Sequence, residues 1–103
     1  MSSSIQKLAD WYAVLCDGDW EHEWGISIDT LDNPGWWVRV DLTDTGLSDR
    51  AFEPVEVHRS ESDWIVARLE VGDIEDPRWC AYCGPLNLEE AIGLFLEWSE
   101  SAA

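Results

Sequence analysis

Residues 24–42 read WGISIDTLDNPGWWVRVDL, and apolar and polar residues alternate on both sides of a central Asn-Pro-Gly. A period of two is typical of β-strands that bury one face. In the centre, Pro34 presets its own φ, and Gly35 can adopt the positive φ of a type II turn. We therefore predict a β-hairpin whose apolar face consists of Ile26, Ile28, Trp36, Val38, Val40 and Leu42.

Further strands follow this hairpin. Residues 51–58 and 63–71 are rich in β-branched and apolar residues, and the polar segment 59–62 between them predicts a turn. Residues 43–50 are polar and contain Gly46, so they predict a loop. A short fifth strand is predicted at residues 78–82, after another loop.

A helix is predicted near each end of the chain. Residues 3–16 place Ile5, Leu8, Tyr12 and Leu15 on one stripe, and Ser3 with Gln6 forms a capping box. A second helix runs from the Asn87/Glu90 capping box to about Trp98, with an apolar stripe of Leu88, Ala91, Ile92, Phe95 and Leu96. The order of elements predicts an α+β fold, an antiparallel β-meander of four to five strands with an N-terminal and a C-terminal helix packed on one face.

Length and segment composition predict a single domain over residues 1–103. The first residues lack the cationic segment and apolar run of a signal peptide, and no uncharged stretch approaches the length of a membrane span. Three cysteines are an odd number and suit a reducing compartment. We expect a soluble, cytoplasmic protein.

The charge is strongly negative. Twenty-two Asp and Glu stand against six Lys and Arg, a formal net charge of −16, yet 46% of the residues are hydrophobic and eight are Trp. This composition is too apolar for a disordered acidic tail. Because affinity for nucleic acid and anionic membranes comes mainly from Lys and Arg, neither is expected as a ligand, and a basic protein is the expected partner.

Cys80-Ala-Tyr-Cys83 has a spacing that can hold zinc or a redox disulfide. A zinc site would need two more ligands, for which Cys16 with His22 or His58 would have to converge. A redox site would need a helix start in a βαβ unit, which the pattern lacks. We therefore expect free thiols, and neither a metal nor a cofactor.

Residues 16–23 read CDGDWEHE and concentrate acidic side chains around one imidazole. Such a cluster could bind a divalent metal or supply an acid/base pair, but the spacing matches no calcium loop. A solvated acidic turn anchored to the core by Trp20 is the simplest interpretation, and partner recognition is the next. Because no catalytic motif is present elsewhere, we do not expect an enzyme.

The tryptophans divide into two groups. Most large aromatics of a small domain are buried or half-buried in its core, which we expect of Trp11, Trp24, Trp36, Trp79 and Trp98. By strand alternation, Trp37 and Trp64 fall on the opposite face of the sheet, where Arg39, Arg68 and several acids also lie. Exposed aromatics among charges are typical of a binding surface.

The run Cys16-Asp17-Gly18-Asp19-Trp20-Glu21-His22, followed by Thr30-Leu31-Asp32-Asn33-Pro34-Gly35-Trp36, resembles the immunity protein 53 family of bacterial polymorphic-toxin systems. The resemblance is densest over residues 11–42, and residues 79–84 are not part of it. It implies a small cytoplasmic antidote that binds a cognate toxin domain, often a nuclease in such systems. It assigns no catalytic residue.

Composition and resemblance lead to the same hypothesis, an immunity protein that occludes a basic, nuclease-like toxin domain through an acidic, tryptophan-containing surface. The alternatives are a small metal-binding or enzymatic domain that uses residues 17–23 and the cysteines, and an adaptor for a basic protein other than a toxin. The sequence leaves the oligomeric state open. The residues expected to contact the partner are Asp17, Asp19, Glu21, Glu23, Asp29, Trp37, Asp41, Trp64 and Glu70.

Overall fold

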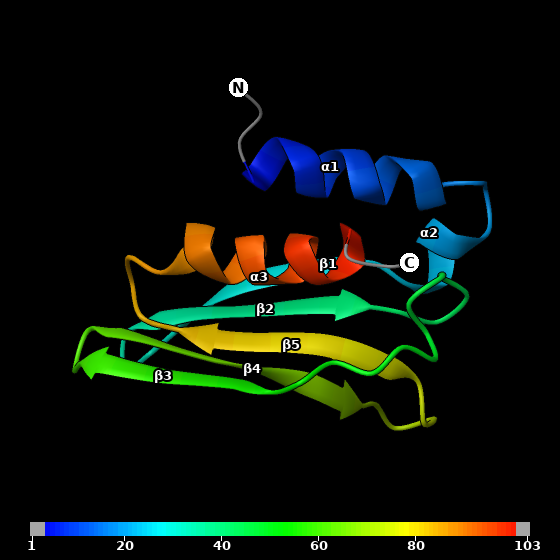
Figure 1. Cartoon of the computed structure of the whole chain (residues 1–103). Coiled ribbons are helices and arrows are strands. Elements are labelled where there is room, and N and C mark those ends of the chain that lie inside the picture. Colours follow the sequence, from blue (N-terminus) through cyan, green and yellow to red (C-terminus); the bar gives the residue numbers. More distant parts are fainter. Residues whose placement is uncertain (1–3, 101–103) are drawn as a thin grey trace.

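The computed structural model describes residues 4–100, which form three helices and one five-stranded sheet (Figure 1). In chain order the elements are α1 (Ser4–Leu15), α2 (Trp20–Glu23), β1 (Ile26–Leu31), β2 (Gly35–Asp41), β3 (Val55–Ser60), β4 (Asp63–Val71), β5 (Pro77–Cys83) and α3 (Leu88–Glu100). The α+β class and the two terminal helices are thereby confirmed. Ser3, the predicted cap of the first helix, lies outside the described residues.

The strand order in the sheet is β1-β2-β5-β4-β3, and all neighbours are antiparallel. The predicted short fifth strand is thus the central one. After β2, residues 42–54 lead the chain to the far edge, and β3, β4 and β5 then return as a meander until β5 pairs with β2. β5 suits the centre because Trp79, Ala81 and Cys83 on one of its faces are fully buried.

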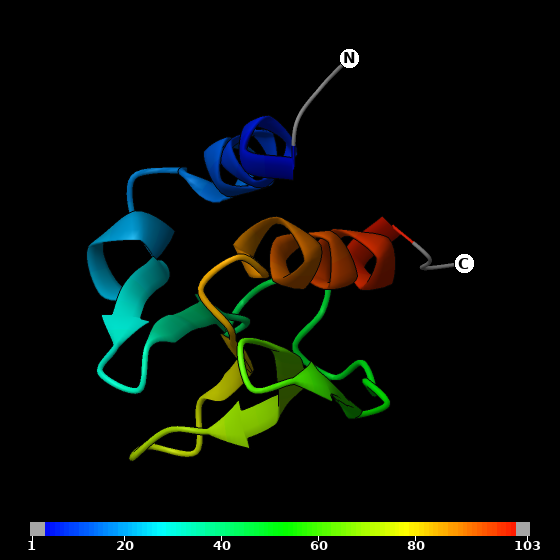
Figure 2. The same cartoon turned by 90° about the vertical axis from the view of Figure 1, so that its left-hand side faces the viewer.

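Both long helices lie on the same side of the sheet (Figures 1 and 2). α3 packs on β5 and β2, whereas α1 packs mainly on α3. The predicted apolar stripe of α1 is therefore only partly covered. Leu8 is buried, but Ile5 remains 51% and Tyr12 36% exposed, because the sheet is already occupied by α3.

The core lies between α3 and the inner face of the sheet. The Phe95 ring of α3 lies 5.3 Å from Trp79 of β5 and 5.0 Å from Trp11 of α1, measured between ring centroids. Trp98 fixes the far end of α3, since its Nε1 donates a hydrogen bond to the Ala51 carbonyl at 2.9 Å. The expected placement of the core tryptophans is correct: Trp79 and Trp98 are buried, and Trp11, Trp24 and Trp36 are half-buried.

The hairpin β1–β2 forms as predicted, with an unbroken register from Ile26 opposite Val40 to Leu31 opposite Gly35. The reason given for its glycine was wrong. Among the described glycines the one with a positive φ is Gly18 (99°), not Gly35. Gly35 is required because a Cβ atom there would collide with the Cys83 carbonyl oxygen of the neighbouring β5. A close approach of two backbones therefore selects glycine at this position.

Candidate protein-interaction site

The turn between α1 and α2 is ordered by two of its own carboxylates. Asp17 Oδ1 accepts hydrogen bonds from the backbone N–H groups of Asp19 and Trp20, both at 3.0 Å. Glu21 accepts in return from the Gly18 N–H, at 2.9 and 3.1 Å. The N–H of Trp20, and next that of Asp19, lowers the pKa of Asp17 from its usual value. Asp17 and Glu21 thus hold the turn in shape.

Trp20 fixes this turn to the rest of the molecule. Its side chain is buried, and its Nε1 donates to the Thr43 carbonyl at 2.8 Å, in the loop that follows β2. Its ring packs edge-on against Trp11 and Tyr12 of α1, at centroid distances of 6.4 and 6.0 Å. The acidic turn is therefore anchored to the rest of the molecule by Trp20, as the sequence predicted.

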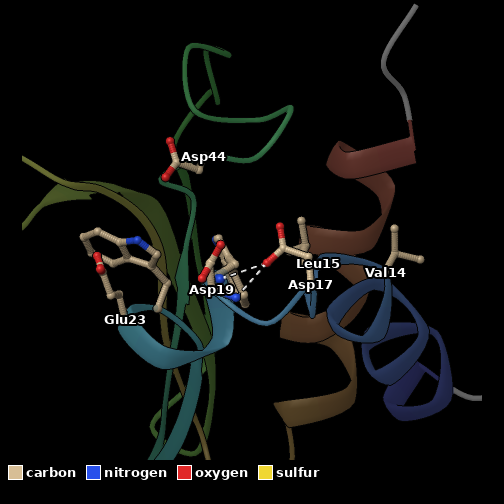
Figure 3. A pocket seen from close by; sticks show the side chains of 8 residues that line it. Val14, Leu15, Asp17, Asp19, Glu23 and Asp44 are labelled. Carbon is tan, nitrogen blue, oxygen red and sulfur yellow. Dashed lines mark hydrogen bonds between the residues drawn. The ribbon is translucent and has the colours of Figure 1, made fainter.

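The turn forms one wall of a pocket of about 430 Å³, which we call the acidic pocket (Figure 3). Three of the acids expected at the site, Asp17, Asp19 and Glu23, line it together with Asp44. Asp44 comes from the loop after β2 and has a φ of 59°. Sequence reasoning missed it, because nothing in the spacing connects residue 44 with residues 17–23. The lining is completed by Val14, Leu15, Trp20 and Trp24.

The carboxylates of the acidic pocket are poorly compensated. Within residues 4–100, the side chains of Asp19, Glu23 and Asp44 accept no hydrogen bond and form no ion pair. Residues 8–38 contain no Lys or Arg but carry seven acids, namely Asp10, Asp17, Asp19, Glu21, Glu23, Asp29 and Asp32. A pocket with several acceptor oxygens and aromatic walls fits the side chain of a Lys or Arg.

The five predicted residues that belong to strands, Asp29, Trp37, Asp41, Trp64 and Glu70, lie on a second surface, the face of the sheet turned away from the helices (Figure 2). We call it the open sheet face. Strand register places Asp29 of β1 opposite Trp37 of β2, and Trp37 opposite Tyr82 of β5. Asp41, Trp64 and Glu70 share this face, and both tryptophans are half-buried. The structure thus divides the predicted residues between two surfaces.

The open sheet face is aromatic and charge-compensated. The Trp37 and Tyr82 rings are stacked, with centroids 6.2 Å apart and an interplanar angle of 4°. Glu70 accepts hydrogen bonds from the Tyr82 hydroxyl (2.9 Å) and from Arg68 Nε (3.1 Å). Burial, and then the hydrogen bond to Glu70, raises the pKa of Tyr82 to about 12.

Asp41 plays a structural part on this face. It is only 5% exposed, and its Oδ2 accepts a hydrogen bond from the Gly25 N–H at 2.9 Å. Its other oxygen lies 3.8 Å from Arg39 Nε and 4.0 Å from Arg78 Nε. Together with Arg68, these arginines are half of the six cationic residues of the chain. Two carboxylates of the open sheet face thus lie beside arginines, whereas carboxylates without a cationic partner among the described residues line the acidic pocket.

The two cysteines of the C-x-x-C point to opposite sides of the sheet. Cys80 is opposite Arg39 on the open sheet face, and Cys83 is opposite Trp36 on the inner face. Residues three apart in a strand cannot both ligate one metal ion or form a disulfide with each other. Burial raises the pKa of each thiol to about 11. In residues 4–100 no three His, Cys, Asp or Glu side chains are grouped to hold a metal ion.

The described residues thus form a small α+β fold with an acidic pocket and a sheet face that carries aromatic side chains. None of its described helices is long and apolar enough to span a membrane. The chain belongs to the immunity protein 53 family, whose family model matches residues 5–100. The match extends over β5 and α3, beyond the region where the sequence resemblance is densest. No match to a curated protein or to a solved structure was found.

Proposed function

We propose that the protein binds the basic surface of a cognate toxin domain and blocks the toxin by covering its nucleic-acid-binding region. The observation that carries this proposal is the acidic pocket, where Asp19, Glu23 and Asp44 face one cavity without a cationic partner among the described residues. A toxin that acts on nucleic acid needs Lys and Arg to bind phosphates. The acidic pocket would bind these Lys and Arg side chains of the toxin.

Charge and aromatic contacts have different roles in this proposal. The acidic pocket and the net charge of −16 attract the partner and fix its orientation. On the open sheet face, Trp37 and Trp64 supply large apolar surfaces that slow dissociation once they are desolvated. Asp29 on the same face is exposed and can pair with a cation at the edge of the contact.

The test compares two triple variants that each remove three negative charges. Asp19→Asn, Glu23→Gln and Asp44→Asn neutralise the acidic pocket, and Glu53→Gln, Asp73→Asn and Glu97→Gln neutralise exposed acids elsewhere. The pocket variant should bind the cognate toxin domain at least about tenfold more weakly, because cations of the partner lose their counter-charges. The control should stay within about threefold of wild type.

The affinity is measured by calorimetry, and the melting temperatures of both variants are recorded beside it. An equal loss of affinity in the two variants would show that net charge alone acts and that the pocket is no contact site. A growth assay of cells that express the toxin distinguishes an immunity protein from an adaptor, because only an immunity protein protects the cells. Wild type should restore growth, and the pocket variant should do so less well.

A further inference from the structure

β1 is an edge strand with free backbone hydrogen-bonding groups. The Asp41 N–H donates to the Gly25 carbonyl at 3.0 Å, which sets the phase of the β1–β2 ladder. In an antiparallel pair, bonded and non-bonded positions alternate. Ile26, Ile28 and Thr30 therefore direct their N–H and C=O groups away from β2, toward the outer edge of the sheet, where residues 4–100 supply no further strand.

An apolar groove runs beside this edge. It has a volume of about 350 Å³ and lies between α1 and β1. Ile26 and Ile28 of β1 line one wall, and Ile5 and Tyr12 of α1 contribute to the other. Ile5, Tyr12 and Ile28 are 51%, 36% and 37% exposed, so the amphipathic stripe of α1 is uncovered on this side. A strand added to β1 would direct every second side chain into the groove.

The opposite edge of the sheet is different. β3 has a register shift between His58 and Ser60, and its outward side chains Glu56 and His58 are charged or polar and exposed. Bulges and charges are common protections of an edge strand against pairing. β1 has an unbroken register over its six residues and lacks such protection apart from Asp29.

From these observations we propose that an extended, basic segment of the toxin domain adds to β1 as a sixth strand, antiparallel or parallel to it, and fills the groove with apolar side chains. The proposal rests on the proposed function and specifies how the partner is bound. Charge selects the occupant, since the edge belongs to the stretch 8–38, which has seven acids and no Lys or Arg. The groove and the acidic pocket adjoin each other in the chain at Gly25 and Trp24.

A second copy of this chain is the competing occupant of the same edge. Two copies would each bring a net charge of −16, and the acids near β1 would face each other. Repulsion between like charges disfavours that pairing, whereas a basic segment is attracted. Backbone hydrogen bonds would then provide affinity, and the groove would provide selectivity for the side chains of the added strand.

Amide hydrogen exchange, followed by NMR on the full chain, tests the proposal directly. In the free protein, the amides of Ile26, Ile28 and Thr30 should exchange rapidly. In complex with catalytically inactive toxin domain, their exchange should slow by at least about tenfold, because they become bonded. The outward amides of Glu56 and His58 on the other edge should show no such change.

Two substitutions at one position isolate the backbone bond. Thr30→Pro removes the outward N–H of an exposed residue, whereas Thr30→Val keeps it and has nearly the same shape. Thr30→Pro should weaken toxin binding by about tenfold, and Thr30→Val by less than about threefold. The exchange experiment on wild type decides the question if Thr30→Pro fails to fold.

Binding of the toxin without protection of Ile26, Ile28 and Thr30 would overturn strand addition and leave the proposed function intact. Failure of the wild-type protein to bind the toxin domain would overturn the proposed function and strand addition together. The same amides could instead be protected in the free protein, to an extent that increases with protein concentration as a dimer forms. That result would assign the edge to a second copy of the chain and overturn strand addition by the toxin domain.

Discussion

Gly35 shows how a single residue determines the spacing of two strands. A Cβ atom at this position would overlap the backbone carbonyl of Cys83, which has no rotamer with which to move away. Gly35→Ala should therefore force β2 and β5 apart and lower the free energy of unfolding by about 1–3 kcal/mol. Gly46→Ala is the matched control, because a Cβ there meets no atom within 4 Å. Urea denaturation measures both, and equal stability of the two variants would disprove the collision.

At the scale of elements, one arginine joins the β3–β4 turn to the start of α3. Arg59 Nε lies 2.9 Å from Asp63, and Arg59 Nη2 lies 2.6 Å from Glu90. Asn87 and next Arg59 lower the pKa of Asp63, and Arg59 is the largest cause that lowers the pKa of Glu90. Groups with a lowered folded-state pKa stabilise the fold above their unfolded pKa, and this contribution is lost as the pH falls through the folded value.

Removal of this cation should therefore change how stability depends on acidity. Arg59→Met should lower the free energy of unfolding at neutral pH. Between about pH 5 and pH 3 the free energy of unfolding of this variant should fall by less than that of wild type, because the pKa values of Asp63 and Glu90 return toward their unfolded values. Urea midpoints measured across this range check the slope. Lys7→Met removes one exposed charge that makes no ion pair within the described residues, and it should keep the wild-type slope. An unchanged slope in Arg59→Met would contradict the linkage.

The open sheet face offers a test at the same scale. Trp37→Ala and Trp64→Ala should each speed dissociation of the toxin domain by roughly tenfold or more, since aromatic anchors in a contact are worth about 2 kcal/mol on truncation. Trp37→Ala should also lower the melting temperature, because its ring stacks on Tyr82. Leu86→Ala removes a 94% exposed side chain outside this face and should change neither quantity. Full binding with a large drop in melting temperature would make these tryptophans structural only.

For the molecule as a whole, the net charge of −16 is the dominant physical property. Association with a basic toxin domain should slow by about tenfold or more as salt rises from about 0.05 M to about 0.5 M, while dissociation should change by less than about twofold. Stopped-flow fluorescence of the tryptophans measures both rates. An association rate that is independent of salt would rule out steering by the acidic surface.

The sequence alone determined the properties that depend on near neighbours in the chain. Alternation over residues 24–42 predicted the β1–β2 hairpin, and the apolar stripe after Asn87 predicted α3. The class of fold and the outward position of Trp37 and Trp64 followed from the same local patterns, and the net charge followed from the composition. These predictions succeed because strand alternation and helix periodicity are set by side chains a few residues apart.

Only the tertiary structure decided which distant segments meet. It placed β5 in the centre of the sheet, brought Asp44 to the pocket formed with residues 17–23, and left Ile5 and Tyr12 uncovered beside the free edge of β1. It also replaced the turn geometry expected of Gly35 by a close contact with β5. Such features depend on competition for burial among all the elements at once, because α3 takes the inner face and excludes α1 from it. No local spacing in a single sequence encodes the outcome of that competition.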